Sequence, residues 1–455
     1  MKRGVTATTV VCVSFFICFS IHQISVLWTS EHPPAIPSKI KENLLKQEPG
    51  DSSQKLLQKP ALMHCDHSRY RYDLCHLNGP TVMYPTNSSF LVMGPTLLPT
   101  LPPRRIRPYP RKWESDIMAD IKEVILSVTG SDTGASGDCQ VYHDTPALVF
   151  STGGYTGNFY HDFTDGFVPL FITIRTLFQQ EEPVLVIANC HNWWLSRYVE
   201  LLRGFTRRPV INLDNETAIH CFPSVKIGLI VHGDMSIDPA LMPNSETFRD
   251  FHALVHRSYD SATTPRLSTA EPRQHPRLVV VSRTHTVGRV ILNQADVIRE
   301  AEEAGFDVEI FAPKTTTMLS EAYELINASH AMLGVHGAAL THMFFLRPGA
   351  VFIQVVALGL EWASDVCFGQ PAPQFGLDYM EYKIKVEEST LAEKYSKDDL
   401  VLTNPRKVVK KGWNYTNLYL KDQDVRLDLV RIRSYLKMAY EKATKLVEKE
   451  QHGRP

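Results

Sequence analysis

The sequence predicts a protein of the α/β class that contains two α/β domains. In two stretches of the chain, short apolar segments of strand length alternate with longer amphipathic segments of helical length. Strands that alternate with helices form parallel sheets, because each helix returns the chain to the edge at which the next strand starts. A polar break rich in Ser, Thr, Pro and Arg, residues 261–276, separates the two stretches. The length of 455 residues and the hydrophobic content of 44% are sufficient for both cores.

The N-terminus predicts a single membrane anchor. Lys2 and Arg3 precede residues 4–28, a run without Asp, Glu, Lys or Arg, and about 20 apolar residues are enough to cross a bilayer. Basic residues beside an anchor stay cytoplasmic, so residues 1–3 form the expected cytoplasmic tail and the chain after Trp28 is expected in a lumen. A cleaved signal peptide is the alternative. The length of the run and the lack of a clear cleavage site favour the anchor.

Residues 29–63 are expected to form a luminal stem, because a segment rich in Pro, Ser, Gln, Lys and Glu cannot bury enough apolar surface to fold. An oxidising lumen permits disulfides, and Cys65 and Cys75 are the expected pair because they are close in sequence. Spacing alone does not choose the other pairs. Four N-glycosylation sequons agree with a luminal location, although the third lies within a helical pattern: Asn87, Asn215, Asn327 and Asn414.

The first predicted domain covers residues 64–260, the second covers residues 277–423, and a helical segment, residues 424–455, closes the chain. In the first domain, strands are expected at 147–152, 184–188, 209–213 and 225–231, with a helix at 194–205. In the second, strands are expected at 278–282, 307–312, 330–335 and 351–356, with helices at 294–304, 319–327 and from Ala338 onward. Ligands of parallel sheets bind beyond the carboxyl ends of the strands, so two such domains would face a shared cleft.

The second domain carries a predicted anion site. Its third strand runs into a turn with His336 and Gly337, where glycine lets the backbone approach a ligand and the N-terminus of a helix binds phosphate oxygens. Arg283 and Arg289 follow the first strand at the same edge, and guanidinium groups suit a diphosphate. Glu361, after the fourth strand, could accept hydrogen bonds from ribose hydroxyls. The alternative is a tight turn flanked by solvated arginines.

Charge restricts the partners. Lys plus Arg number 48 and Asp plus Glu number 49, which gives a formal net charge of -1. No overall field would therefore attract nucleic acid or an anionic membrane surface, and any anion must bind at a local site.

The first domain carries a predicted acid–base site in residues 151–171, after its first apolar strand. His161, Asp162 or Asp165 could act as a general base that deprotonates an acceptor hydroxyl, because that role needs an imidazole or a carboxylate within hydrogen-bond reach. His161 is preferred because an imidazole titrates nearer to luminal pH. The alternative is a helix N-terminus in which the aspartates act as caps or favourable first-turn charges.

As an ordered set, six segments resemble glycosyltransferase family 61, in particular the grass-expanded branch of plant xylan arabinosyl- and xylosyltransferases. The segments are CDHSRYRYDLC, GGYTGNFYHDFTDGFVPLF, SRTHTVGRVILN, GVHGAALTHMFFLRPGA, GLEWASDVCFGQPAPQFGLDYMEYKI and NYTNLYLKDQDVRLDLVRIR. The resemblance implies a GT-B-type fold, with residues 64–260 on the acceptor side and residues 277–423 binding the nucleotide sugar. It also implies a type II Golgi membrane protein and an inverting transfer that needs no bound metal. Mapped onto this chain, it places donor binding on Arg283, Arg289, His336, Gly337 and Glu361, and the base on His161 or Asp162.

The triplet Asp422-Gln423-Asp424 requires separate treatment, because an Asp-x-Asp triplet holds a metal ion in the other main glycosyltransferase architecture. There the triplet follows a strand inside the nucleotide domain, whereas here it directly precedes the last predicted helix. We interpret it as an N-terminal cap of that helix and expect no metal cofactor.

The function that follows from the resemblance is transfer of a pentose from UDP-arabinofuranose or UDP-xylose to the xylan backbone or its side chains, in the synthesis of cell-wall arabinoxylan. Alternatives within the family are an N-glycan beta-1,2-xylosyltransferase or another family 61 transferase. An alternative of a different class is a non-catalytic luminal glycan-binding protein, which would not require the basic diphosphate site. Association with other Golgi transferases is a further expectation.

Overall fold

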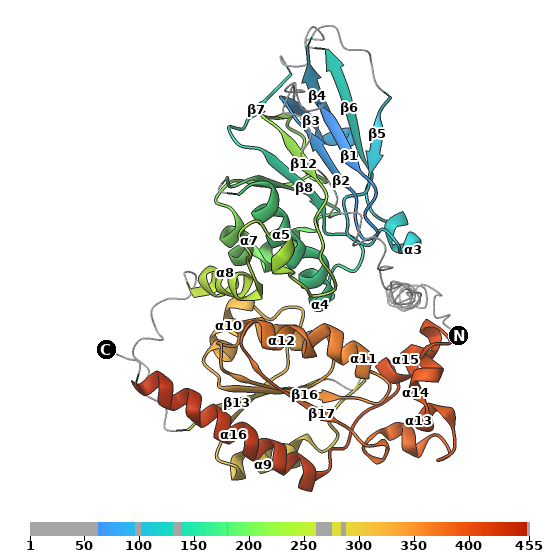
Figure 1. The fold of residues 1–455 in the computed structure, drawn as a ribbon, viewed down its shortest axis with the longest axis vertical. Helices are drawn as coiled ribbons and strands as arrows, with labels where there is room; N and C mark the ends of the chain where they lie inside the picture. The colour runs from blue at the N-terminus through green and yellow to red at the C-terminus, as the bar shows by residue number, and fades with distance from the viewer. Residues whose placement is uncertain are drawn as a thin grey trace, which may run out of the picture.

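The computed structural model describes residues 62–95, 102–130, 138–179, 181–260, 275–283 and 288–452. The expected tail and anchor, and nearly all of the expected stem, lie outside these ranges. Within them, no helix is both long enough and apolar enough to cross a membrane. The described strands form three sheets in a mixed α/β structure. Figure 1 shows two of the sheets in the blue and green part of the chain and the third in the orange part.

The C-terminal sheet is entirely parallel, with the strand order β14-β13-β15-β16-β17. Its strands are β13 (Arg277–Val281), β14 (Asp307–Phe311), β15 (Ala331–Val335), β16 (Val351–Val356) and β17 (Asp378–Lys383). Helices α9 (Gln294–Glu303) and α16 (Leu429–His452) cover one face, and α10 (Leu319–Asn327) and α12 (Pro371–Gln374) cover the other (Figure 1). The two strands that follow β13 in the chain lie on opposite sides of it in the sheet, β14 on one side and β15 on the other. The carboxyl ends of β13 and β15 therefore form a topological switch point, the usual ligand position in such sheets.

Most predicted elements of this region are confirmed; two differ. The segment after β15 is a 3-10 helix, η8 (Ala338–Phe345), rather than an α-helix. The last helix starts at Leu429 because Val425, before it, forms bridges with Ile291 and Ser389. Short helices complete the region: α11 (Glu361–Ser364), the π-helix η9 (Asp365–Gly369), η10 (Val386–Glu388), η11 (Thr390–Glu393), α13 (Leu400–Thr403), α14 (Pro405–Val409) and α15 (Trp413–Lys421).

The N-terminal region contains a sheet with the order β1-β2-β12-β8-β9-β10, in which the last four strands are parallel. Its strands are β1 (Met63–Asp66), β2 (Leu74–Leu77), β8 (Ala147–Ser151), β9 (Val184–Ala188), β10 (Val210–Asn212) and β12 (Val225–Ile227). The expected strand at 225–231 is shorter because Gly228 has a φ of +104° and lies against the carbonyl oxygen of Asp73. The expected helix at 194–205 is divided at Tyr198 into α6 (Asn192–Arg197) and α7 (Val199–Phe205).

A second, mainly antiparallel sheet in this region was not predicted. Its order is β5-β6-β4-β3-β11-β7. Its strands are β3 (Thr81–Tyr84), β4 (Ser89–Gly94), β5 (Arg104–Ile106), β6 (Val124–Gly130), β7 (Val141–Tyr142) and β11 (His220–Phe222). The short helices η1 (Pro85–Asn87), α3 (Ser115–Ala119) and η5 (Pro239–Leu241) lie in loops of the N-terminal region.

Helices of the N-terminal region pack directly on the C-terminal region. They are α4 (Phe159–His161), the π-helix η4 (Asp162–Phe167) and α8 (Phe248–Asp260), and α5 (Val168–Leu177) continues the chain from η4. The ring of Phe163 stacks on that of Phe344 with centroids 5.0 Å apart, and Phe159 stacks on His342 at 4.2 Å. One hydrophobic cluster contains side chains from both regions. This packing fixes how the sheet that contains β8 faces the C-terminal sheet, with α4 and α8 between them (Figure 1).

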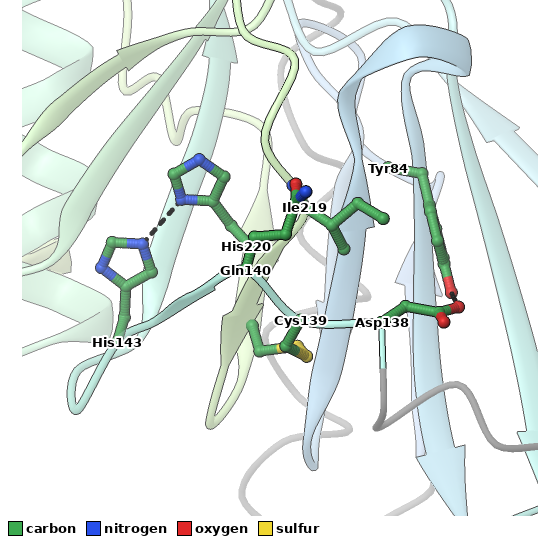
Figure 2. Close-up of a disulfide and its surroundings, with 8 residues drawn as sticks. Tyr84, Asp138, Cys139, Gln140, His143, Ile219 and His220 are labelled. Atoms are coloured by element: carbon green, nitrogen blue, oxygen red, sulfur yellow. Dashed lines mark hydrogen bonds between the residues drawn. A yellow bond between two sulfur atoms is a disulfide. The ribbon is translucent and has the colours of Figure 1, made fainter.

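The predicted disulfide between Cys65 and Cys75 is confirmed, and it joins directly opposed residues of β1 and β2. A second disulfide, Cys139–Cys221, ties the segment before β7 to β11. Figure 2 shows His143 and His220 beside it, with a 2.8 Å hydrogen bond between Nε2 of the first and Nδ1 of the second.

The four sequons differ in accessibility. The side chains of Asn87, Asn215 and Asn414 are exposed. Asn327 is half-buried, and its Oδ1 is buried without a hydrogen-bond partner in the described chain. Modification of Asn327 would require this turn of α10 to open, so the other three positions are the better acceptors. Glycosylation at each stays a prediction.

Candidate active site

The donor side of the predicted site lies at the switch point of the C-terminal sheet. Arg283 follows the end of β13, and His336 follows the end of β15 directly. Gly337 has a φ of +154°, and a Cβ atom on it would lie only 2.3 Å from a terminal nitrogen of Arg283. Glycine is therefore needed at this position, because any side chain would displace the guanidinium. A Cβ atom here would also lie 3.4 Å from a terminal nitrogen of Arg289, so both arginines reach the His336–Gly337 turn as predicted.

Within the described residues neither arginine forms a salt bridge, and although the charge of Asp424 acts to raise the pKa of Arg283, burial outweighs it and holds that pKa below its usual value. Arg283 donates from Nε to the carbonyl oxygen of Gly288 at 3.0 Å, and Arg289 donates from a terminal nitrogen to the carbonyl oxygen of His336 at 2.9 Å. Arg289 is 9% exposed, and its Nε is buried with no partner in the described chain. Burial, followed by the charge of Arg283, lowers the pKa of Arg289 to about 9. Two close, largely desolvated cations of this kind favour an anion between them.

His336 is held in one tautomer. Its Nδ1 accepts a hydrogen bond from the side-chain amide of Gln354 at 3.1 Å, and the Gln354 oxygen accepts one from the Tyr379 hydroxyl at 2.8 Å. Burial and the two nearby arginines lower the pKa of His336 well below its usual value, so the ring is neutral. The proton of a neutral ring with an accepting Nδ1 lies on Nε2. His336 can therefore donate one hydrogen bond to a ligand.

Glu361 is the first residue of α11 and is exposed. It accepts a hydrogen bond from the backbone N–H of Gly359 at 3.3 Å, and within the described ranges it forms no ion pair with Arg283 or Arg289. Gln423 nevertheless links the turn before Glu361 to the loop that carries Arg289. The Gln423 side chain donates to the carbonyl oxygen of Leu358 at 2.8 Å, and its backbone oxygen accepts from the N–H of Arg289 at 2.6 Å.

The interpretation of the Asp422-Gln423-Asp424 triplet as a helix cap is wrong. Asp428 caps α16, because its Oδ1 accepts from the backbone N–H of Val430 at 2.9 Å. Asp424 instead accepts from the backbone N–H of Val290 at 2.8 Å. The triplet thus supports the loop that carries Arg289. Sequence reasoning missed this role because the two segments are 134 positions apart.

On the acceptor side, His161 lies in a buried polar network at the carboxyl end of β8. Its Nδ1 lies 2.8 Å from Oδ2 of Asp165, one helical turn later. A proton on Nδ1 donates to this carboxylate, which leaves the lone pair of Nε2 free to accept a proton. The Tyr155 ring stacks on the imidazole at a centroid distance of 4.3 Å and fixes its plane. This arrangement is that of a histidine general base oriented by an aspartate.

Asp165 is the orienting group of this pair. Burial alone would raise its pKa, but the charge of Arg111 and the hydrogen bond from His161 outweigh burial and hold the pKa below the usual value. Arg111 is 1% exposed and donates to Asp165 from Nε at 3.0 Å and to Glu114 at 2.8 Å. Glu114 in turn accepts from the Tyr155 hydroxyl at 2.6 Å. Sequence reasoning missed Arg111 and Glu114, which follow no predicted strand and carry no local motif.

Asp162 points elsewhere. Its two oxygens accept from the indole N–H of Trp194 at 3.1 Å and from the Tyr198 hydroxyl at 2.7 Å. It is buried, and burial raises its pKa to about 6. The structure therefore separates the two neighbours, with His161 in the Arg111 network and Asp162 holding α6 and α7 against η4.

The two sides of the site meet at Phe368, in η9. Its ring contacts His336 at a centroid distance of 5.6 Å and Tyr160 at 5.8 Å. Tyr160 directly precedes His161 in α4. The predicted donor residue His336 and the predicted base His161 therefore lie close to one another at the junction of the two regions.

One group of potential metal ligands occurs within the described residues: Cys65, His67 and Cys75. Both cysteines form the first disulfide, so their sulfur atoms are not available as thiolate ligands. This group lies on the β1–β2 hairpin and includes none of the predicted donor residues.

Comparison with known proteins supports a transferase. The family model described as Glycosyltransferase 61 matches residues 159–353, a range that includes His161, Arg283 and His336. The chain is 38% identical over 427 residues to a xylan glycosyltransferase of Arabidopsis thaliana, covering 90% of this chain and 85% of that protein. It is 32% identical to a beta-1,2-xylosyltransferase of Oryza sativa subsp. japonica over 94% of both chains. It is 33% identical to an alpha-1,3-arabinosyltransferase of the same species, covering 86% of this chain and 65% of that protein.

A parallel sheet with a cationic site at its switch point, joined to a histidine–aspartate pair, fits the chemistry of a glycosyltransferase, and the protein is an enzyme of this class. More specifically, the chain belongs to glycosyltransferase family 61.

Proposed function

We propose that this protein is an inverting pentosyltransferase of xylan synthesis. It transfers arabinofuranose or xylose from a UDP-sugar to the xylan backbone or its side chains. The observation that carries the proposal is the close pair formed by buried Arg289 and half-buried Arg283, neither of which forms a salt bridge within the described chain. The names of similar members of the family, which include xylan glycosyltransferase, arabinosyltransferase and xylosyltransferase, support the substrate class.

In the proposed mechanism, the diphosphate of the donor occupies the space between Arg283 and Arg289. These cations, with a hydrogen bond from Nε2 of His336, stabilise the negative charge that develops on the leaving diphosphate. Glu361 accepts from the ribose hydroxyls. Nε2 of His161 removes the proton of the acceptor hydroxyl as that oxygen attacks the anomeric carbon. A single displacement with base and leaving group on opposite sides inverts the anomeric centre.

The proposal includes a GT-B-type arrangement of the two regions and a location in the Golgi membrane with a luminal catalytic part. The uncharged run at residues 4–28 supports the anchor. The two disulfides support an oxidising compartment.

Transfer is expected to survive chelation by EDTA, because Arg283, Arg289 and His336 supply the charge and donors that a divalent cation would otherwise provide. The measurement compares initial rates in EDTA with rates in added Mn²⁺. A rate abolished by EDTA and restored by Mn²⁺ would show that a metal ion carries the diphosphate.

The test of the proposed function is an assay of the purified protein with UDP-arabinofuranose and UDP-xylose, each against xylo-oligosaccharides and against an N-glycan. Pentose transfer to a xylo-oligosaccharide is the expected result. Transfer only to the N-glycan would identify the alternative xylosyltransferase. Glycan binding without transfer of either pentose would identify the non-catalytic alternative.

A further inference from the structure

The hairpin loop between β1 and β2, residues 67–73, lies at the functional edge of the N-terminal sheet. Strand β2 is antiparallel to β12, and Cys75 pairs with Ile227, the last residue of β12. Because β12 and β8 are parallel, the loop before β2 emerges at the edge where both of those strands end. The segment with His161 follows β8 from this same edge. Ligands of parallel sheets bind at this edge.

Tyr70, on this loop, presents an open aromatic face. Its ring stacks on that of Trp113 with centroids 5.5 Å apart and planes 12° apart, yet Tyr70 remains 62% exposed. One face is covered by the indole, so the exposure belongs to the rest of the ring, including its outer face.

The loop that carries Tyr70 is held in place on several sides. The disulfide Cys65–Cys75 closes it. The backbone N–H of Lys112 donates to the carbonyl oxygen of Arg71 at 3.1 Å, and the Lys112 ammonium donates to that of His67 at 2.5 Å. An aromatic surface fixed in this way loses little conformational entropy when a ligand binds.

The stack leads through Arg111 to the Nδ1 edge of the candidate base. The guanidinium of Arg111 lies 5.3 Å from the Trp113 ring centre, and its terminal nitrogen lies 3.3 Å from Nδ1 of His161. A single side chain therefore separates the Trp113 ring from the imidazole. Arg71 also packs on Trp113, at 5.0 Å, and pairs with Asp234 at 3.0 Å. This partly exposed pair places charged donors and acceptors beside the aromatic stack.

We propose that Tyr70, supported by Trp113, is a stacking subsite for a pyranose ring of the acceptor chain. The inference rests on the proposed function, which makes that acceptor a neutral polymer of xylose. A neutral polymer offers no charge for ion pairing, so its binding depends on hydrogen bonds and on contact between the C–H faces of its rings and aromatic faces. Tyr70 supplies the aromatic face, Arg71 and Asp234 supply hydrogen-bonding groups for hydroxyls, and His161 lies beyond Arg111 at the reacting end.

The test compares Tyr70→Ala with Tyr70→Phe, which keeps the ring, and with Tyr142→Ala. Tyr142 is 71% exposed but lies in the other N-terminal sheet, so it is a matched control for loss of an exposed tyrosine. We expect Tyr70→Ala to raise the KM for xylohexaose roughly tenfold, with kcat and the Kd for UDP unchanged. Tyr70→Phe and Tyr142→Ala should retain the KM of the wild type. Calorimetric titration with xylohexaose, without donor, should show the same ranking.

The outcomes separate this inference from the proposed function. If pentose transfer occurs but Tyr70→Ala has the KM and xylohexaose affinity of the wild type, the subsite is overturned and the function stands. If no pentose is transferred but Tyr70→Ala still loses xylohexaose affinity, the subsite stands and the function fails. A fall in UDP affinity in Tyr70→Ala would show that Tyr70 supports the fold rather than the acceptor, and would also overturn the subsite.

Discussion

Replacing Arg289 with methionine is expected to raise the Kd for UDP about 100-fold while leaving the protein folded. The substitution removes a desolvated guanidinium whose Nε has no partner in the described chain. Charge-assisted hydrogen bonds of such a group to a diphosphate are worth about 3 kcal/mol, which corresponds to roughly two orders of magnitude in Kd. Isothermal titration with UDP measures the change directly.

The same substitution should leave the free protein at least as stable as the wild type. Burial already lowers the pKa of Arg289 to about 9, which means that the surroundings disfavour its charged form. Methionine fills the place of the aliphatic part of the arginine side chain and has no charge to desolvate, so removal of this cost offsets the loss of the hydrogen bond to His336. The thermal midpoint without UDP should therefore be unchanged or higher, whereas the stabilisation by added UDP should largely disappear.

Arg299→Met is the matched control. Arg299 is an exposed arginine of α9 that pairs with Asp296 on the same helix, so its loss should change neither the Kd for UDP nor the midpoint by much. An Arg289→Met protein that binds UDP as tightly as the wild type would remove Arg289 from the donor site. A folded variant with weakened binding and lowered stability would instead assign the arginine mainly to the structure.

The convergence of Arg283, His336 and Gly337 could be predicted from the sequence for a simple physical reason. Buried parallel strands appear in a sequence as continuous apolar runs, and both β13 and β15 contain such a run. The carboxyl ends of adjacent parallel strands share one edge of the sheet. Residues just after two such runs therefore meet, wherever they lie in the sequence.

The conformation of the loop that carries Arg289 could not be predicted in this way. Arg289 has a φ of +58°, and its backbone N–H is bonded to Gln423 from the far end of the region. Arg111 likewise reaches Asp165 across 54 positions of sequence. Such contacts leave no local pattern, because the partners are far apart in sequence and at least one partner of each pair lies in a loop whose position depends on the whole fold.

The second N-terminal sheet shows a different limit. Buried and half-buried residues alternate in β4, but the sequence SFLVMG does not show this, because Leu91 and Met93 at half-buried positions are as apolar as the buried residues between them. It pairs with β3, which directly precedes it, and with β6, which lies beyond β5 and α3, while β11, the next strand beyond β3, comes from more than 120 residues further along the chain. A short apolar run does not reveal which segments it pairs with, so this sheet needed the structure.

His161→Ala is expected to lower kcat for pentose transfer by about 10³-fold while leaving the Kd for UDP unchanged. General base catalysis typically contributes two to four orders of magnitude, and His161 lies outside the site of Arg283 and Arg289 that is proposed to bind the diphosphate. Asp162→Asn should reduce transfer far less, because its carboxylate faces Trp194 and Tyr198 in the core. The reverse ranking would move the base to Asp162, and full activity in both variants would remove this segment from the chemistry.

Asp165→Asn distinguishes a base from a merely buried histidine. The carboxylate accepts a hydrogen bond from the N–H of Nδ1, which keeps the ring proton on Nδ1 and leaves the lone pair of Nε2 open. If the amide nitrogen of asparagine takes the position of the carboxylate oxygen, it donates to Nδ1 and moves the imidazole proton to Nε2, where the proton blocks the base. This variant should lose transfer almost as completely as His161→Ala, with UDP binding intact, and added imidazole should rescue His161→Ala but not Asp165→Asn. Imidazole can enter the space left by the missing ring, whereas in Asp165→Asn the native ring still occupies that space in the wrong tautomer.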